Sequence, residues 1–148
     1  MSGSALAIVM AIVAGLAGSV QVAVMSALGA RIGVTGALAF ATTFTAILAI
    51  AIVLVGQHSL HAFPRALEQP WWLLSGGVMG LFIILTITFA GPRIGVTAVV
   101  AILIAGQLVA GAAIDRFGWF GVDRIAVGWP RALGIVLLGV GAALSLKR

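Results

Sequence analysis

Five long apolar stretches, separated by short polar ones, dominate the hydrophobic pattern of the chain. The charge-free stretches cover residues 2–30, 32–57, 71–91, 94–114 and 132–146. A membrane-spanning helix needs about 20 predominantly apolar residues, and the first four stretches meet that length. The fifth is shorter unless it includes Trp129 and Pro130, which suit the first turn of a helix at a membrane interface. The pattern therefore predicts five transmembrane helices, over about residues 4–30, 33–56, 71–91, 94–114 and 129–146.

The composition excludes most other classes of protein. Of 148 residues, 63% are hydrophobic and 7% are charged, whereas a soluble domain carries about 25% charged residues. Disorder needs the opposite bias, low hydrophobicity with high charge. The chain has no Cys, which excludes disulfides and thiol chemistry. The first apolar stretch lacks the basic start and the short length of a signal peptide. We expect an all-α integral membrane protein forming one domain over residues 1–148, with the lipid bilayer as its solvent and no nucleic acid as partner.

The basic residues divide evenly between the two sides of the membrane. Five spans place the termini on opposite sides, and the positive-inside rule then reads the Lys/Arg difference between the loops. The side that holds the N-terminus has Arg65, Arg116, Arg124 and Arg131, and the other side has Arg31, Arg93, Lys147 and Arg148. This balance indicates that copies insert both ways (dual topology), although the N-terminal amine or a single Arg is an alternative determinant.

A short internal repeat occurs where two pairs of spans meet. Arg-Ile-Gly-Val-Thr occupies residues 31–35 and again residues 93–97. Each copy is typical of a tight turn between two helices, with Gly33 or Gly95 allowing the turn and Pro92 preceding the second one. The sequence therefore predicts two parallel helical hairpins followed by an unpaired fifth helix.

Small residues recur along the predicted spans and indicate close helix packing, since small side chains let helices approach in lipid. One such face in the first span includes Gly15, the third span contains the pair Gly76 and Gly80, and the fourth contains Gly106 with Ala110.

Polar residues within the spans are the candidate substrate site, because an intramembrane polar group is costly. The deepest are Gln21 and Gln107, with Ser26 and Thr43 as weaker candidates. Interhelical hydrogen bonds are an equally good explanation for the two amides. Most Ser and Thr hydroxyls are expected to bond to carbonyls of their own helix.

Asp115 closes the fourth span and is the acidic residue nearest the membrane. It is a candidate to carry a coupling proton, or else an interfacial charge beside Arg116, and Asp123 with Arg124 fits a surface ion pair. His58 and His61 lack a third ligand and make a poor metal site. We expect no metal, no cofactor and no enzymatic activity, because neither a phosphate loop nor a catalytic set of residues is present.

The fourth span and the loop after it resemble a known family. The segment over residues 91–121 combines Pro-Arg-Ile-Gly, Gly-Gln within the span and Ile-Asp-x-Phe-Gly-x-Phe-Gly after it. This combination resembles the half-size YdcZ-like family of the drug/metabolite transporter superfamily, most specifically at Gly106, Gln107, Asp115, Gly118 and Gly121. The resemblance implies a bacterial inner membrane, export, and assembly of two five-span units. It does not imply a substrate. The membrane-embedded Glu of small multidrug transporters is absent from the first span.

Transport is the function that these features favour. Alternating access commonly uses two inverted halves around a midplane site, and one chain with five spans does not contain both. We expect an antiparallel ten-helix homodimer, or a pair with an oppositely oriented paralogue, that carries small metabolites or drug-like solutes. The alternatives are a dual-topology passive channel and a structural or accessory membrane subunit.

Overall fold

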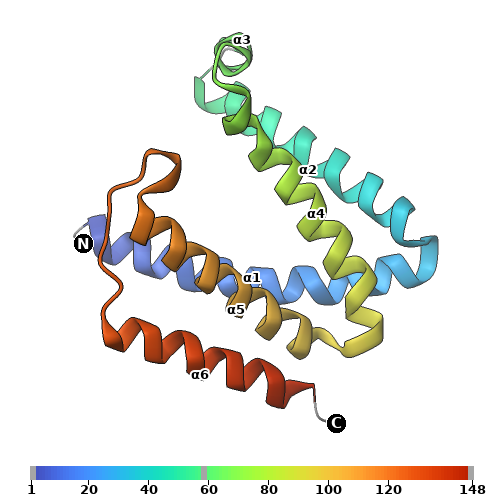
Figure 1. Cartoon of the computed structure of the whole chain (residues 1–148). Helices are drawn as coiled ribbons and strands as arrows, with labels where there is room; N and C mark the ends of the chain where they lie inside the picture. Colours follow the sequence, from blue (N-terminus) through green and yellow to red (C-terminus); the bar gives the residue numbers. More distant parts are fainter. Residues whose placement is uncertain (1–2, 58–59, 147–148) are drawn as a thin grey trace. The chain divides into compact units, whose positions relative to one another are not determined.

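The chain is helical in a computed structural model that describes residues 3–57 and 60–146 (Figure 1). Its long helices are α1 (Gly3–Ile32), α2 (Val34–Gln57), α4 (Trp71–Ile94) and α5 (Val96–Phe117), followed by the shorter α6 (Trp129–Ser145). The polar segments between them form a short helix, α3 (Ala62–Leu67), and a 3₁₀ turn, η1 (Trp119–Gly121). No strand occurs in the described ranges.

Four of these helices are long and apolar enough to cross a membrane, namely α1, α2, α4 and α5. The fifth, α6, has 17 residues and begins at Trp129 with Pro130 in its first turn. The predicted all-α class is thus confirmed for the described residues. The assignment of one membrane domain with five spans, and the dimer, remain predictions.

Two glycines separate the long helices in the same way. Gly33 lies between α1 and α2 with φ +83°, and Gly95 lies between α4 and α5 with φ +84°. Both values fall in the region that glycine adopts without steric cost. The carbonyl of each glycine accepts a hydrogen bond from the amide four residues later, at 3.0 Å from Ala37 and 3.2 Å from Val99. The repeat in the sequence is therefore also a repeat in backbone conformation.

Buried positions repeat with the same spacing. The two residues that follow the glycines by four positions, Ala37 and Val99, are both buried. Upstream of the glycines, three further pairs of corresponding positions are buried as well: Met25 with Ile87, Ser26 with Thr88, and Gly29 with Gly91. The similarity therefore extends beyond the five identical residues, to the pattern of burial along the ends of α1 and α4.

The chain divides into two compact units. Unit 1 contains Met1–Val22 and Arg93–Arg148, and unit 2 contains Ala23–Pro92. In unit 2, the last turns of α1 approach α4 closely, since a Cβ atom on Gly29 would lie 2.6 Å from Cγ2 of Thr88. In unit 1, α5 and α6 lie side by side and run in opposite directions (Figure 1).

Candidate functional site

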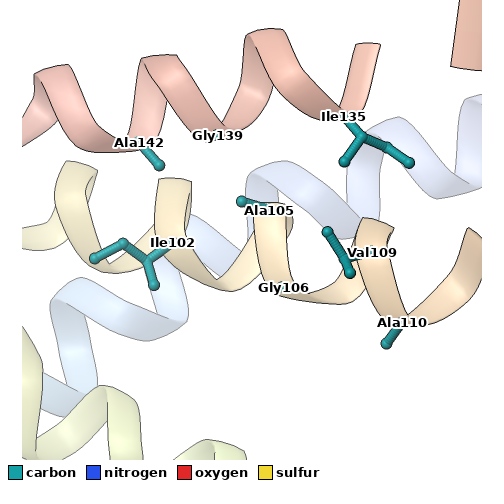
Figure 2. Close-up of a pocket in the computed structure, with 8 residues that line it drawn as sticks. All are labelled: Ile102, Ala105, Gly106, Val109, Ala110, Ile135, Gly139 and Ala142. Carbon is teal, nitrogen blue, oxygen red and sulfur yellow. The ribbon is translucent and has the colours of Figure 1, made fainter. Parts of the chain in front are cut away.

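An apolar groove runs between α5 and α6 in unit 1 (Figure 2). Its volume is about 490 Å³, which lies within the usual range of small-molecule sites. The groove has no charged or hydrogen-bonding side chain in its lining, which consists of Ile102, Ala105, Gly106, Val109, Ala110, Ile135, Gly139 and Ala142. The small residues leave space between the two helices, and Ile102, Val109 and Ile135 are the larger side chains of the lining.

An ion pair joins α5 and α6 beyond one end of this groove. Nη2 of Arg131 donates to Oδ2 of Asp115 at 2.5 Å. The side chain of Asp115 is 24% exposed and that of Arg131 is 37% exposed. The sequence predicted either a coupling residue or an interfacial charge at Asp115, and the structure adds an ion-pair partner, Arg131, sixteen residues later. The sequence feature that could have indicated this pair is the Arg in the first turn of the last predicted span.

The loop between the two helices folds back on the end of α5. The amide of Ile125 donates to the carbonyl of Asp115 at 2.9 Å. Gly118 ends α5 in the left-handed conformation, with φ +66°, and its amide donates to the Ile114 carbonyl at 2.8 Å. This is the usual glycine cap of a helix C-terminus. Asp115 thus holds the loop through its backbone and α6 through its side chain.

The side chain of Arg124 covers the glycine cap. Its Cγ lies 2.7 Å from the position that a Cβ atom on Gly118 would occupy. Within the described part of the chain, no ion pair joins Asp123 to Arg124, so the surface pair expected there is wrong. The rings of Phe117 and Trp119 stack with centroids 5.1 Å apart, and Phe120 has a positive φ of 60°. The loop therefore has a defined fold with exposed aromatic rings.

The four predicted substrate residues lie on three helices. Gln21 on α1 and Gln107 on α5 are both exposed and both belong to unit 1. Gln107 directly follows Gly106, which lines the groove, but it is not itself in the lining. In unit 2, Thr43 on α2 is exposed and Ser26 on α1 is buried. Whether the four line one site remains a prediction.

The hydroxyl groups of several intramembrane threonines bond to their own helix, as the sequence predicts. Thr42 donates to the Leu38 carbonyl at 2.9 Å, and Thr86 donates to the Phe82 carbonyl at 2.8 Å. Thr88 donates to the Ile84 carbonyl at 2.7 Å. These groups are satisfied locally, which makes them weak candidates for binding a substrate.

The glycines that were predicted to pack the long helices have unoccupied space around their Cβ positions in the single chain. A Cβ atom added to Gly15, Gly80 or Gly106 would meet no other atom within 4 Å. Pro92 lies inside the last turn of α4, which continues to Ile94. The ring of Pro92 has no N–H to bond the carbonyl of Thr88, four residues earlier.

Metal-binding clusters are not found in the described residues. No group of three or more His, Asp or Glu side chains is placed to hold a metal ion there. His58 lies outside the described ranges, and His61 precedes α3 at its N-terminus.

Comparisons with known proteins agree with the sequence resemblance. A family described as "Putative inner membrane exporter, YdcZ" matches residues 6–144. The inner membrane protein YdcZ of Escherichia coli (strain K12) is 35% identical over 78 residues, which are 53% of this chain and 52% of that protein. The match therefore spans about half the length of this relative. No solved structure matches the chain. Such a family points to a transporter rather than an enzyme, and its members are placed in the inner membrane. The chain thus belongs to the YdcZ family and is a multi-pass protein of the bacterial inner membrane.

Proposed function

We propose that this chain is one half of an exporter that carries small metabolites or drug-like solutes by alternating access, as an antiparallel homodimer. The observation that carries the proposal is the parallel repeat. Gly33 and Gly95 have nearly the same positive φ and are followed by equivalent hydrogen bonds. A repeat of this kind supplies two similarly oriented hairpins, whereas alternating access commonly uses inverted halves. A second copy in the opposite orientation is the simplest source of the inverted half.

The open helix faces support a second copy. Gly15, Gly80 and Gly106 have nothing within 4 Å of their Cβ positions. In lipid, helices associate through such small-residue faces. Moving an apolar side chain from acyl chains to another helix gains little free energy, so close packing has to supply the attraction. The even division of Lys and Arg between the loops supports insertion in both orientations.

The two exposed amides support a substrate site in the assembled protein. Gln21 and Gln107 lie within apolar helices and are exposed in the single chain. An amide facing acyl chains without a hydrogen-bond partner is costly. A polar cavity shared by two copies removes that cost. We therefore propose that Gln21 and Gln107 bind small neutral or zwitterionic solutes, and that Thr43 and Ser26 contribute to substrate binding as well. Asp115 stays the candidate coupling residue, and a coupling step there has to break its bond to Arg131.

Topology is the first experiment. The chain has no native Cys, so Gln69→Cys and Ile32→Cys each introduce a single thiol, on exposed residues between spans and on opposite predicted sides. A membrane-impermeant thiol reagent is applied to intact cells and then to opened ones. Dual topology predicts that each site divides between a labelled and a protected fraction. Labelling of each site from one side alone contradicts the homodimer and leaves a paralogue of opposite orientation as the partner.

Transport itself is tested in proteoliposomes. Vesicles are loaded with a defined mixture of amino acids, sugars and nucleosides, and the solutes released are identified by mass spectrometry. We expect saturable release of one class, and loss of that release in Gln107→Ala, while Gln69→Ala on the exposed loop remains active. Non-saturating flux supports the channel instead. Absence of flux for every solute, together with co-purification of a different membrane protein, supports an accessory subunit.

A further inference from the structure

The last helix packs against α5, and their contact leaves a groove at its surface. The helix packing of α6 within the described chain is against α5. That contact contains the groove of about 490 Å³, and several of its lining residues are Gly or Ala. Hydrophobic burial gives little drive for two helices to associate in lipid, so close packing and polar contacts must hold them. Small residues give the helices close contact along one face, and the ion pair of Asp115 and Arg131 is the side-chain hydrogen bond that joins them in the described part of the chain.

The ion pair lies just past the groove on both helices. On α5, the last lining residue is Ala110, and Asp115 follows it by five positions. On α6, the first lining residue is Ile135, and Arg131 precedes it by four positions. One helical turn is about 3.6 residues. The pair therefore bridges the two helices about one turn beyond the groove, at the end next to the loop.

Both charges oppose the dipoles of their own helices. Asp115 is in the last turn of α5, where the partial charge of the helix is negative. Arg131 is in the first turn of α6, where it is positive. Local helix electrostatics favours the reverse arrangement at both positions. Each charge is therefore stabilised by the other rather than by its own helix, and the link is weaker than the same pair with its residues exchanged.

We propose that Asp115 and Arg131 form a latch that closes the loop end of the α5–α6 groove and releases that end when the pair separates. The attraction between the charges acts only near the loop, so its loss is felt there first. The backbone bond from Ile125 to Asp115 does not involve the carboxylate and keeps the loop attached to α5 after release. The opening of the latch is a property of this chain and does not depend on transport. Only its role in transport rests on the proposed export function.

Distances between spin labels test the latch without any substrate. Because the chain has no Cys, labels attach only at introduced sites, and exposed positions are available at both ends of the two helices. The loop-end pair is Arg116→Cys with Leu133→Cys, and the far-end pair is Thr97→Cys with Ala143→Cys. Each pair is measured by pulsed electron resonance in lipid nanodiscs, in an otherwise native chain and in each variant.

The variants separate a latch from a general loss of packing. In Asp115→Asn, we expect the loop-end distribution to shift to longer distances and broaden, while the far-end distribution stays native. In the exchange of Asp115→Arg with Arg131→Asp, the loop-end distribution becomes at least as narrow as the native one, because both charges then also suit their helix dipoles. Asp123→Asn, in the same loop and without an ion pair among the described residues, leaves both distributions unchanged.

Two results overturn the latch. One is a native loop-end distribution in Asp115→Asn. The other is equal broadening at both ends, which would make the pair a general stabiliser of the hairpin. A variant that misfolds is recognised separately, by its loss of helical circular dichroism, and the exchanged pair still tests the proposal because it keeps both charges. If the distances change as expected while proteoliposomes show no flux of any solute, the latch stands and the export function fails.

Discussion

The close approach of α1 and α4 makes Gly29→Ala a sharp test of the packing in unit 2. A Cβ atom on Gly29 would lie 2.6 Å from Cγ2 of Thr88 and 3.5 Å from its carbonyl oxygen. Two carbon atoms in contact are normally about 3.5–4.0 Å apart. The two groups must therefore separate by about 1 Å to restore the normal contact distance.

Thr88 has little freedom to move away. It is fully buried, with 0% of its surface exposed, and its hydroxyl donates to the Ile84 carbonyl at 2.7 Å. Rotating the methyl group away would break that hydrogen bond. Overpacking of this kind costs about 1–3 kcal/mol. We expect Gly29→Ala to lower the free energy of unfolding by this amount relative to Gly15→Ala, the same substitution on the same helix with nothing within 4 Å of its Cβ position.

The assay is unfolding in mixed detergent–dodecyl sulfate micelles, followed by tryptophan fluorescence. Comparison of the two alanine variants removes the intrinsic gain of Ala over Gly in a helix, about 1 kcal/mol in water. Thr88→Ser deletes the clashing methyl group and keeps the hydroxyl, so Gly29→Ala combined with Thr88→Ser should recover most of the loss. Equal stability of Gly29→Ala and Gly15→Ala, or no recovery in the double variant, would refute the close contact.

Three further predictions follow from the backbone and from the exposed amide. Gly95→Ala should lower stability by about 1–3 kcal/mol, because φ of +84° with ψ of 156° is a conformation that essentially only glycine adopts; unfolding in the same micelles measures the loss, and a native midpoint would contradict it. Gly118→Ala should be costly as well, since the new methyl group would meet the Arg124 side chain at 2.7 Å; Arg124→Ala in the same background should restore part of the stability, and no restoration would argue against that contact. Gln107→Leu should leave unfolding nearly unchanged and abolish solute release, because the amide is exposed in the single chain; undiminished release would remove Gln107 from the site.

The sequence predicts much of the fold because its signals are local. Long apolar stretches determine where the helices occur, since in a membrane each helix satisfies its own backbone. The repeated Arg-Ile-Gly-Val-Thr locates the breaks at Gly33 and Gly95, because a positive φ at a single residue requires glycine. The bonds from Thr hydroxyls to their own helices also follow from spacing alone.

Two kinds of feature were not predicted from the sequence: a very short helix, and a contact between residues far apart in the chain. Helix α3 has only six residues, too few to show a helical period of apolar positions. The sequence predicted no partner for Asp115 across the loop, whereas the carboxylate pairs with Arg131, sixteen residues later, rather than with the adjacent Arg116. That choice depends on the left-handed turn at Gly118 and the bond from Ile125 to Asp115, and neither is visible as a pattern of residue types.

Helix α6 lies outside the repeat, and this position is consistent with the proposed release of its loop end. The ends of α1 and α4 bury corresponding residues, including Ser26 and Thr88, so each hairpin has a counterpart built in the same way. Movement of α1 against α4 would disturb the close contact of Gly29 with Thr88. Helix α6 has no such counterpart, borders an open groove and is joined to α5 by a charge pair that both helix dipoles oppose. Separation of the charge pair is therefore the step that we expect to free the loop end of α6. A conformational change that leaves the hairpins intact would begin with α6.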